Sequence, residues 1–188
     1  KKCSGRVEEL EKILFKKPSN GNLGISHVRW ATHGVPNIIN AHPHSSDIVS
    51  VVHNGIIENS DEIKTKLEKK GIKFKSQTDT EVITLLITEA LQKEKPLESV
   101  FKTLKLLKGS FALGIIFKNY NDIIIGARRG SPLAVGYSKE ENYLGSDSYA
   151  LKSMTNKISY LDDGDLCIVS KDKVEFFNEN KKKINKKV

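Results

Sequence analysis

The spacing of the apolar residues changes near Gly109, and this change constrains the fold more than any other feature of the chain. Between residues 60 and 107 the apolar residues recur at helical intervals, and from residue 110 onward they alternate with polar residues, as in half-buried strands. Gly, Asn, Asp or Pro interrupts the later part at short intervals. Helices in one block and strands in hairpins favour an α+β fold with antiparallel sheets.

The same patterns predict the individual elements. Helices are predicted at Glu8–Lys17, from Ser60 or Asp61 to Gly71, and at Thr80–Gln92, Leu97–Leu107 and Tyr149–Met154. Strands are predicted at Leu23–Trp30, at Ile48–His53 before an Asn54-Gly55 turn, near Phe74, and at Ser110–Phe117, Asp122–Ala127, Leu133–Tyr137, Tyr143–Ser146, Ile158–Leu161, Asp165–Ser170 and Val174–Phe177. Residues 31–46 form a long polar loop of the kind that often carries function.

Size and composition indicate an ordinary single domain. The chain has 188 residues, 38% of them hydrophobic. No apolar run approaches the roughly 20 residues of a membrane span. Its two cysteines, Cys3 and Cys167, fit no metal or redox spacing. We expect a cytoplasmic protein without a membrane partner.

The net charge of +8 raises the possibility of a nucleic-acid partner. Most of the basic residues are lysines, however, and few aromatic residues accompany them to stack on bases. A solvated Lys-rich surface and C-terminal tail is the expected explanation, with no nucleic acid bound.

Three short segments carry residues suited to binding charged groups of a small ligand. Arg29 and Trp30 stand at the end of a predicted strand, either as a surface arginine beside a core tryptophan or as an anion site, in which Arg29 grips a carboxylate with two parallel hydrogen bonds. Asn54 and Gly55 form either a hairpin turn or an oxyanion hole, in which a side-chain amide and a backbone N–H face one developing negative charge. Asp79 starts a helix and can pair with an ammonium group, while Thr78 and Glu81 have the spacing of a capping box.

The histidines do not suggest a metal site. His42 and His44 are two residues apart, with His33 upstream and His53 downstream. Neither a cysteine nor a histidine pair one helical turn apart accompanies them, as zinc sites usually require. We expect no metal ion and no cofactor.

Taken together, these segments resemble a known family. The matching strings occur in the family's order and cover nearly the whole chain: GISHVRWATHG (24–34), NAHPH (40–44), VVHNGIIEN (51–59), QTDTEV (77–82), GSFAL (109–113), RRGSPL (128–133), GSD (145–147) and DDGD (162–165). They resemble the class II glutamine amidotransferase (glutaminase) domains of the glucosamine-6-phosphate synthases. The resemblance implies the N-terminal nucleophile hydrolase fold, a four-layer αββα sandwich of two antiparallel sheets.

The resemblance also implies a reaction and a set of roles. A terminal cysteine attacks the amide of glutamine, ammonia leaves, and water releases glutamate from a thioester. In the full-length protein, a homo-oligomer, the ammonia aminates fructose 6-phosphate to give glucosamine 6-phosphate. Site residues implied by the resemblance are Arg29 for the α-carboxylate, Asp79 for the α-ammonium, Trp30, Thr32 and His33 as pocket lining, and Asn54 and Gly55 as the oxyanion hole.

The chain departs from the family at its start. The family begins with Cys-Gly-Ile, whereas Lys1 and Lys2 precede Cys3 here, so the Cys3 nitrogen is a peptide nitrogen that cannot act as a base. We therefore expect the nucleophile and the first strands to lie upstream, and the chain alone to be inactive. Residues 1–178 are the expected amidotransferase domain, and residues 179–188 a Lys-rich linker towards a sugar isomerase domain.

Three alternatives remain open from sequence alone. The chain is compatible with another class II amidotransferase, such as an amidophosphoribosyltransferase. A non-catalytic glutamine-binding module that lacks the cysteine is the second alternative. A basic nucleic-acid-binding domain is the third, and it would bind with a strong dependence on salt.

Overall fold

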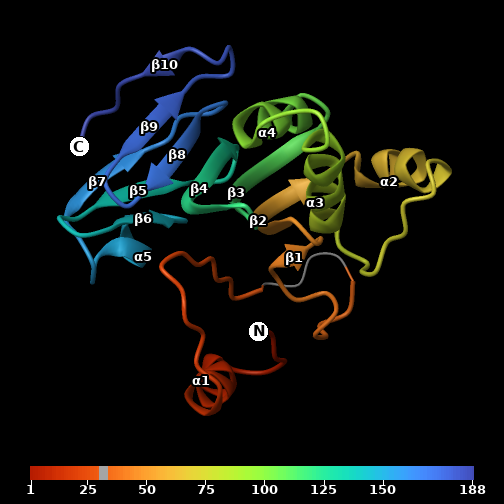
Figure 1. Ribbon diagram of the computed structural model, residues 1–188, viewed down its shortest axis with the longest axis horizontal. Helices are drawn as coiled ribbons and strands as arrows, with labels where there is room; N and C mark the ends of the chain where they lie inside the picture. Colours follow the sequence, from red (N-terminus) through yellow and green to blue (C-terminus); the bar gives the residue numbers. More distant parts are fainter. Residues whose placement is uncertain (30–33) are drawn as a thin grey trace.

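The computed structural model describes residues 1–29 and 34–188 (Figure 1). The helices of these residues are α1 (Val7–Lys16), α2 (Ser60–Lys69), α3 (Asp79–Ala90), α4 (Pro96–Leu104) and α5 (Ser148–Leu151). In Figure 1, α2, α3 and α4 gather beside one sheet, whereas α1 stands away from both sheets and buries none of its residues.

The larger sheet has seven strands in the order β1-β2-β3-β4-β8-β9-β10, every neighbouring pair antiparallel. Its strands are β1 (His44–Ser45), β2 (Val49–Ile57), β3 (Gly109–Phe117), β4 (Tyr120–Arg129), β8 (Leu166–Ser170), β9 (Val174–Phe177) and β10 (Lys183–Ile184). The smaller sheet has the order β6-β5-β7, with β5 (Ala134–Tyr137), β6 (Asn142–Gly145) and β7 (Lys157–Tyr160).

Two hydrophobic cores separate the layers. The first lies between the larger sheet and helices α2, α3 and α4, and contains Leu67, Ile83, Val100, Leu113 and Ile125 among its fully buried side chains. The second fills the space between the two sheets. Because hydrophobic burial is the main stabilising force, each face of the larger sheet is held by its own core.

Leu144 of β6 fixes how closely the two sheets approach. Gly114 of β3 and Gly126 of β4 are paired across the larger sheet, and a Cβ at Gly126 would lie 2.9 Å from the Leu144 side chain and 2.7 Å from the Cys167 sulfur. The two glycines therefore leave a recess for this leucine. On the outer face of the smaller sheet, Leu151 of α5 is fully buried, which completes four layers in the order α, β, β, α.

Most predicted elements are confirmed to within a few residues, including the five helices and the seven strands after Gly109. Two predicted strands are wrong for the described residues. Residues 23–29 run along the sheet and pack Leu23 and Ile25 against the second core, but they are not hydrogen-bonded into a ladder. The segment around Phe74 is likewise outside any strand, because it serves as a partly buried connection between α2 and α3.

The Lys-rich C-terminal residues contact strands of both sheets. β10 pairs with β9, and the Lys186 ammonium lies 2.6 Å from Asp162 and also contacts the buried Asp165. The Ser159 hydroxyl donates to the Lys187 carbonyl at 2.6 Å. In the described part of the chain, no helix has the length and apolarity needed to cross a membrane.

The recess around Leu144 makes a direct prediction for stability. Gly126→Ala should lower the free energy of unfolding by about 1–3 kcal/mol, because the new methyl group overpacks the space between Cys167 and Leu144. Gly24→Ala is the matched control, since a Cβ there meets no atom within 4 Å. Urea denaturation of both variants measures the difference, and equal stabilities would contradict the proposed packing.

Candidate functional site

A cavity of about 290 Å³ lies where β2, the start of α3 and the segment before residue 30 meet. Its lining brings together four residues that the sequence proposed as a site from three distant segments, namely Arg29, Asn54, Gly55 and Asp79. His27, His42, His53 and Thr80 complete much of the remaining wall. Trp30, Thr32 and His33, the other predicted site residues, lie outside the described residues.

β2 runs straight through Asn54 and Gly55, so the predicted hairpin turn is wrong. Asn54 pairs with Ala112 and Gly55 with Phe111, in an unbroken register with β3. Gly55 has a φ of +129°, and a Cβ there would lie 2.3 Å from the Ser110 carbonyl oxygen. Glycine is therefore required at this position by the approach of β3, and the Asn-Gly pair forms part of a strand rather than its end.

Asp79 is the first residue of α3 and is only 6% exposed. One carboxylate oxygen accepts a hydrogen bond from the Ile57 N–H at 2.8 Å, and the other lies 4.0 Å from Nδ1 of His53. The amino end of a helix also favours a negative charge. The carboxylate is thus held at the cavity wall by the strand and the helix together.

The predicted capping box at the start of α3 is wrong. Thr78 occupies the cap position, but its hydroxyl contacts Nε2 of His44 at 2.9 Å and makes no capping bond. The Glu81 carboxylate reaches past Thr78 and accepts from the backbone N–H groups of Lys75 and Ser76 at 2.8 and 2.6 Å. Tertiary contacts therefore replace the local capping pattern that the spacing suggested.

Arg29 is directed at the loop that follows it. Its guanidinium donates to the carbonyl oxygens of Gly34 and Val35 at 3.1 and 3.3 Å. Asn40 and Gln77 anchor that loop, because the Asn40 amide donates to Val35 and Gln77, and its oxygen accepts from the Gln77 N–H at 2.9 Å. A positive charge is thus placed on the wall that also carries Asp79 and Asn54.

Three histidines form a continuous polar chain beside the cavity. Nε2 of His27 lies 2.7 Å from Oδ1 of Asn54, and Nδ1 of His27 lies 3.0 Å from Nδ1 of His42. Nε2 of His42 lies 2.9 Å from the Thr80 hydroxyl, which lies 3.0 Å from Nδ1 of His53. From the sequence, His42 and His53 were considered only as metal ligands, and no role was predicted for His27 or Thr80. All four residues nevertheless fall within or beside the strings that match the family.

His27, His42 and His44 are held in the neutral state by their surroundings. Burial, followed by the neighbouring His27 and His44, lowers the pKa of His42 to about 2. Burial, followed by the charge of Lys2, lowers the pKa of His44 to about 4. Burial also lowers the pKa of His27, against the opposing effect of its hydrogen bonds to Asn54 and the His53 backbone.

In the described ranges, no group of three or more His, Cys, Asp or Glu side chains has the arrangement of a metal site.

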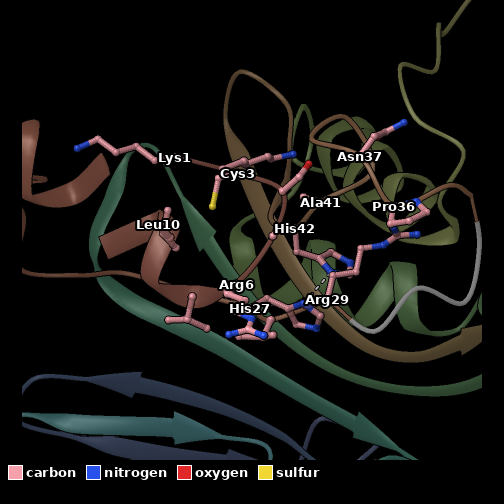
Figure 2. Close-up of a pocket in the computed structure, with 15 residues that line it drawn as sticks. Lys1, Cys3, Arg6, Leu10, His27, Arg29, Pro36, Asn37, Ala41 and His42 are labelled. Carbon is pink, nitrogen blue, oxygen red and sulfur yellow. Dashed lines mark hydrogen bonds between the residues drawn. The ribbon is translucent and has the colours of Figure 1, made fainter. Parts of the chain in front are cut away.

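A second cavity of about 240 Å³ adjoins the first and shares His27, Val28, Arg29 and His42 with it. Cys3 lines this second cavity and is half-buried. Figure 2 shows His27, Arg29 and His42 close together, with Cys3 set apart from them on a different segment. The other cysteine, Cys167, is fully buried between the sheets, and burial raises the pKa of its thiol to about 12.

Comparison with known proteins identifies the family. The sequence profile described as a glutamine amidotransferase domain matches residues 38–153, a span that contains Asn54, Gly55 and Asp79. The chain belongs to this glutamine amidotransferase domain family.

Two relatives that are similar over nearly the whole chain carry the same name. The glutamine–fructose-6-phosphate aminotransferase (isomerizing) of Mesorhizobium japonicum is 50% identical over 188 residues, which are all of this chain and 31% of that protein. The protein of the same name from Zymomonas mobilis is 50% identical over 176 residues, which are 93% of this chain and 29% of that protein. The chain thus spans about a third of the length of these relatives.

Solved structures confirm the fold. The structure described as an allosteric regulatory enzyme of purine biosynthesis matches with a TM-score of 0.69 at 25% identity, over 81% of this chain and 34% of that one. The glutamine phosphoribosylpyrophosphate amidotransferase of B. subtilis matches with a TM-score of 0.67 at 24% identity, over the same shares of the two chains. The expected N-terminal nucleophile hydrolase sandwich is confirmed by these matches and by the two antiparallel sheets.

The depressed pKa of His44 predicts a loss of stability in acid. As the pH falls from about 6.5 to about 4, the unfolded chain takes up a proton at His44 that the folded chain does not bind, so the free energy of unfolding decreases. The contribution is up to about 3 kcal/mol. His44→Gln keeps a polar group that can reach Thr78 but does not titrate.

Urea denaturation at several pH values between 4 and 7 measures this effect. The free energy of unfolding of the His44→Gln variant should depend less steeply on pH than that of the wild type over this range. Parallel curves for the two proteins would show that His44 is protonated equally in the folded and unfolded states.

Proposed function

We propose that the chain is the glutaminase domain of an enzyme that takes the amide nitrogen of glutamine and transfers it to fructose 6-phosphate, giving glucosamine 6-phosphate. The observation that carries this proposal is the single cavity that gathers Arg29, Asn54, Gly55 and Asp79. The 50% identity to aminotransferases of that name supports the choice of acceptor.

The cavity lining carries one positive and one negative side chain, which suits the zwitterionic end of glutamine. The Arg29 guanidinium binds the α-carboxylate, and the Asp79 carboxylate binds the α-ammonium. Trp30, Thr32 and His33 line the pocket in this proposal. A site with a partner for both charges selects a free amino acid over an amide that lacks the α-carboxylate and the α-ammonium. With such an amide, the Arg29 and Asp79 charges would be left desolvated and without a partner in the ligand.

Asn54 and Gly55 serve the reacting end of the substrate. A cysteine thiolate attacks the side-chain carbonyl carbon, and the carbonyl oxygen becomes negatively charged in the tetrahedral intermediate. The Asn54 amide and the Gly55 N–H stabilise that oxygen. The C–N bond then breaks, the leaving nitrogen takes a proton and departs as ammonia, and water hydrolyses the thioester to glutamate.

We assign the nucleophile to a cysteine of the full-length gene product other than the two in this chain. Cys3 has its nitrogen in a peptide bond with Lys2, and the Cys167 thiol is buried with a pKa of about 12. In the same proposal the enzyme acts in the cytoplasm, where both free thiols stay reduced, and residues 179–188 lead towards a sugar isomerase domain.

The full-length gene product tests the proposal directly. It should release glutamate from glutamine and form glucosamine 6-phosphate when fructose 6-phosphate is present. Formation of phosphoribosylamine from phosphoribosyl pyrophosphate would instead indicate the activity named for the structural relative from B. subtilis. Glutamine binding without any turnover would indicate a non-catalytic glutamine-binding module.

The role of Asp79 can be separated from its structural contact with Ile57. Asp79→Asn keeps an oxygen that accepts from the Ile57 N–H but loses the negative charge. The KM for glutamine should rise about 10- to 100-fold, the effect expected for one charged hydrogen bond, while kcat changes little.

Glutaramate, which is glutamine without its α-amino group, provides the matched substrate for this test. The Asp79→Asn variant should hydrolyse glutaramate as well as the wild type does, because the missing charge has no ammonium to bind. An equal loss of activity on both substrates would show that Asp79 acts through the fold rather than by contact with the ammonium.

The assignment of the nucleophile gives a further prediction. Cys3→Ala should leave the rate of glutamine hydrolysis by the full-length gene product within about twofold of the wild type, since the substituted group neither reacts nor acts as a base. Steady-state glutamate release measures this rate. A loss of several orders of magnitude would identify Cys3 as the nucleophile after all.

A further inference from the structure

We propose that the Asn54 amide is oriented by a series of hydrogen bonds of fixed direction, the histidine chain, which consists of His27, His42, Thr80 and, at the far end, His53. In this arrangement His27 is a positioning residue for the oxyanion hole. The catalytic consequence rests on the proposed function, whereas the orientation of the amide rests on the contacts alone.

The donor and acceptor of each hydrogen bond in the histidine chain can be assigned in turn, starting from Asn54. Oδ1 of Asn54 can only accept, so Nε2 of His27 carries the proton at the 2.7 Å contact. Nδ1 of the neutral His27 ring is then an acceptor, so Nδ1 of His42 donates to it. Nε2 of His42 in turn accepts from the Thr80 hydroxyl, whose oxygen accepts from Nδ1 of His53. The Asp79 carboxylate, 4.0 Å from Nδ1 of His53, favours the proton on that nitrogen, whereas Nε2 lies 3.5 Å from the Ser110 carbonyl, at the outer limit of a hydrogen bond.

The reverse direction is unfavourable with either orientation of the Asn54 amide. With the amide turned so that its NH2 group faces His27, the reverse direction would take the proton off Nδ1 of His53, the nitrogen that faces the Asp79 carboxylate. With the Asn54 oxygen towards His27, it requires a charged ring. His27 would have to donate from both nitrogens, to Asn54 and to His42, and would then be an imidazolium. Burial lowers the pKa of His27, and the positive charge of Arg29 adds to this effect. A second positive charge beside the guanidinium on the same cavity wall is unfavourable, so the neutral arrangement is retained.

The histidine chain passes round the edge of β2 from one face of the larger sheet to the other. Successive side chains of a strand point to opposite faces, so the buried His53 faces α3 while Asn54 faces the other side. β1 is only two residues long and covers β2 at Ser50 and Val51. Beyond the end of β1, His42 and His27 cover the edge and connect Thr80 of α3 to Asn54.

This arrangement decides which end of the amide faces the substrate. Oδ1 and Nδ2 of an asparagine have nearly the same shape, and a half-turn about the last side-chain bond exchanges them. Asn54 is exposed at the cavity, so packing does not choose between the two orientations. With Oδ1 held by the His27 N–H, the NH2 group is left to donate into the cavity, as an oxyanion hole requires.

Asp79 lies beside His53, at the end of the histidine chain opposite to Asn54. Its carboxylate lies 4.0 Å from Nδ1 of His53, the ring that donates to Thr80. The residue proposed to bind the substrate ammonium is therefore joined to the residue proposed to stabilise the oxyanion. Both ends of the substrate are served by one connected set of side chains.

Neutron crystallography of the deuterated full-length protein tests the hydrogen-bond direction without any catalytic assay. We expect deuterium on Nε2 of His27 and on Nδ1 of His42, and the Asn54 amide with its oxygen towards His27. Deuterium on Nδ1 of His27, or an Asn54 amide turned the other way, would overturn the proposal. This readout is decisive even if the protein has no glutaminase activity.

Two substitutions of His27 in the full-length protein test the catalytic consequence. Glutamine places an amide N–H near the position of Nε2 and can still donate to Asn54, whereas asparagine is too short to do so. For His27→Asn we expect kcat for glutamine hydrolysis to fall about 10- to 100-fold, with KM within about threefold of the wild type. His27→Gln should recover most of that loss.

The Asn54→Ala background supplies the control. If His27 acts through Asn54, then adding His27→Asn to Asn54→Ala should cost no more than about twofold further. A full additional loss in that background, or equal losses for His27→Asn and His27→Gln, would overturn the positioning role. A wild-type protein that does not hydrolyse glutamine would instead refute the proposed function and leave the neutron result standing.

Discussion

The unbroken pairing of β2 with β3 through Asn54 and Gly55 is the contact on which the site depends. The ladder keeps the strand alternation intact across this dipeptide, so His53 points towards α3 while Asn54 points to the opposite face. A turn at this point would end the alternation and send the two side chains in unrelated directions. Gly55 allows the pairing, because any larger residue would meet the Ser110 carbonyl.

The sequence predicted well those elements whose pattern reflects burial. The helices from residue 60 to 107 and the later strands have apolar residues at regular spacing, and burial against the sheet preserves that spacing in the fold. The failures came where a local signal was overruled by a distant contact. Asn54-Gly55 has the composition of a turn, but β3 holds it in a strand. Thr78 and Glu81 have capping spacing, but His44 and the Lys75–Ser76 backbone engage them instead.

The candidate site was predictable in part for the same reason. Arg29, Asn54, Gly55 and Asp79 were proposed because each residue type suits one part of an amino acid, and the structure places them on one cavity. The histidine chain was not found, since its members come from four separate segments and their contacts depend on how those segments meet. Spacing along the chain carries no information on whether a histidine at position 27 touches one at position 42.

The depressed pKa values of these histidines have a consequence for how the site responds to its surroundings. His42, with a pKa of about 2, and His44, with a pKa of about 4, keep the same protonation state throughout the neutral range. They therefore behave as permanent dipoles and not as a reservoir of exchangeable protons. In the proposed function, His42 gives the cavity wall a dipole that is already oriented before a charge develops beside it, so little reorganisation energy is spent.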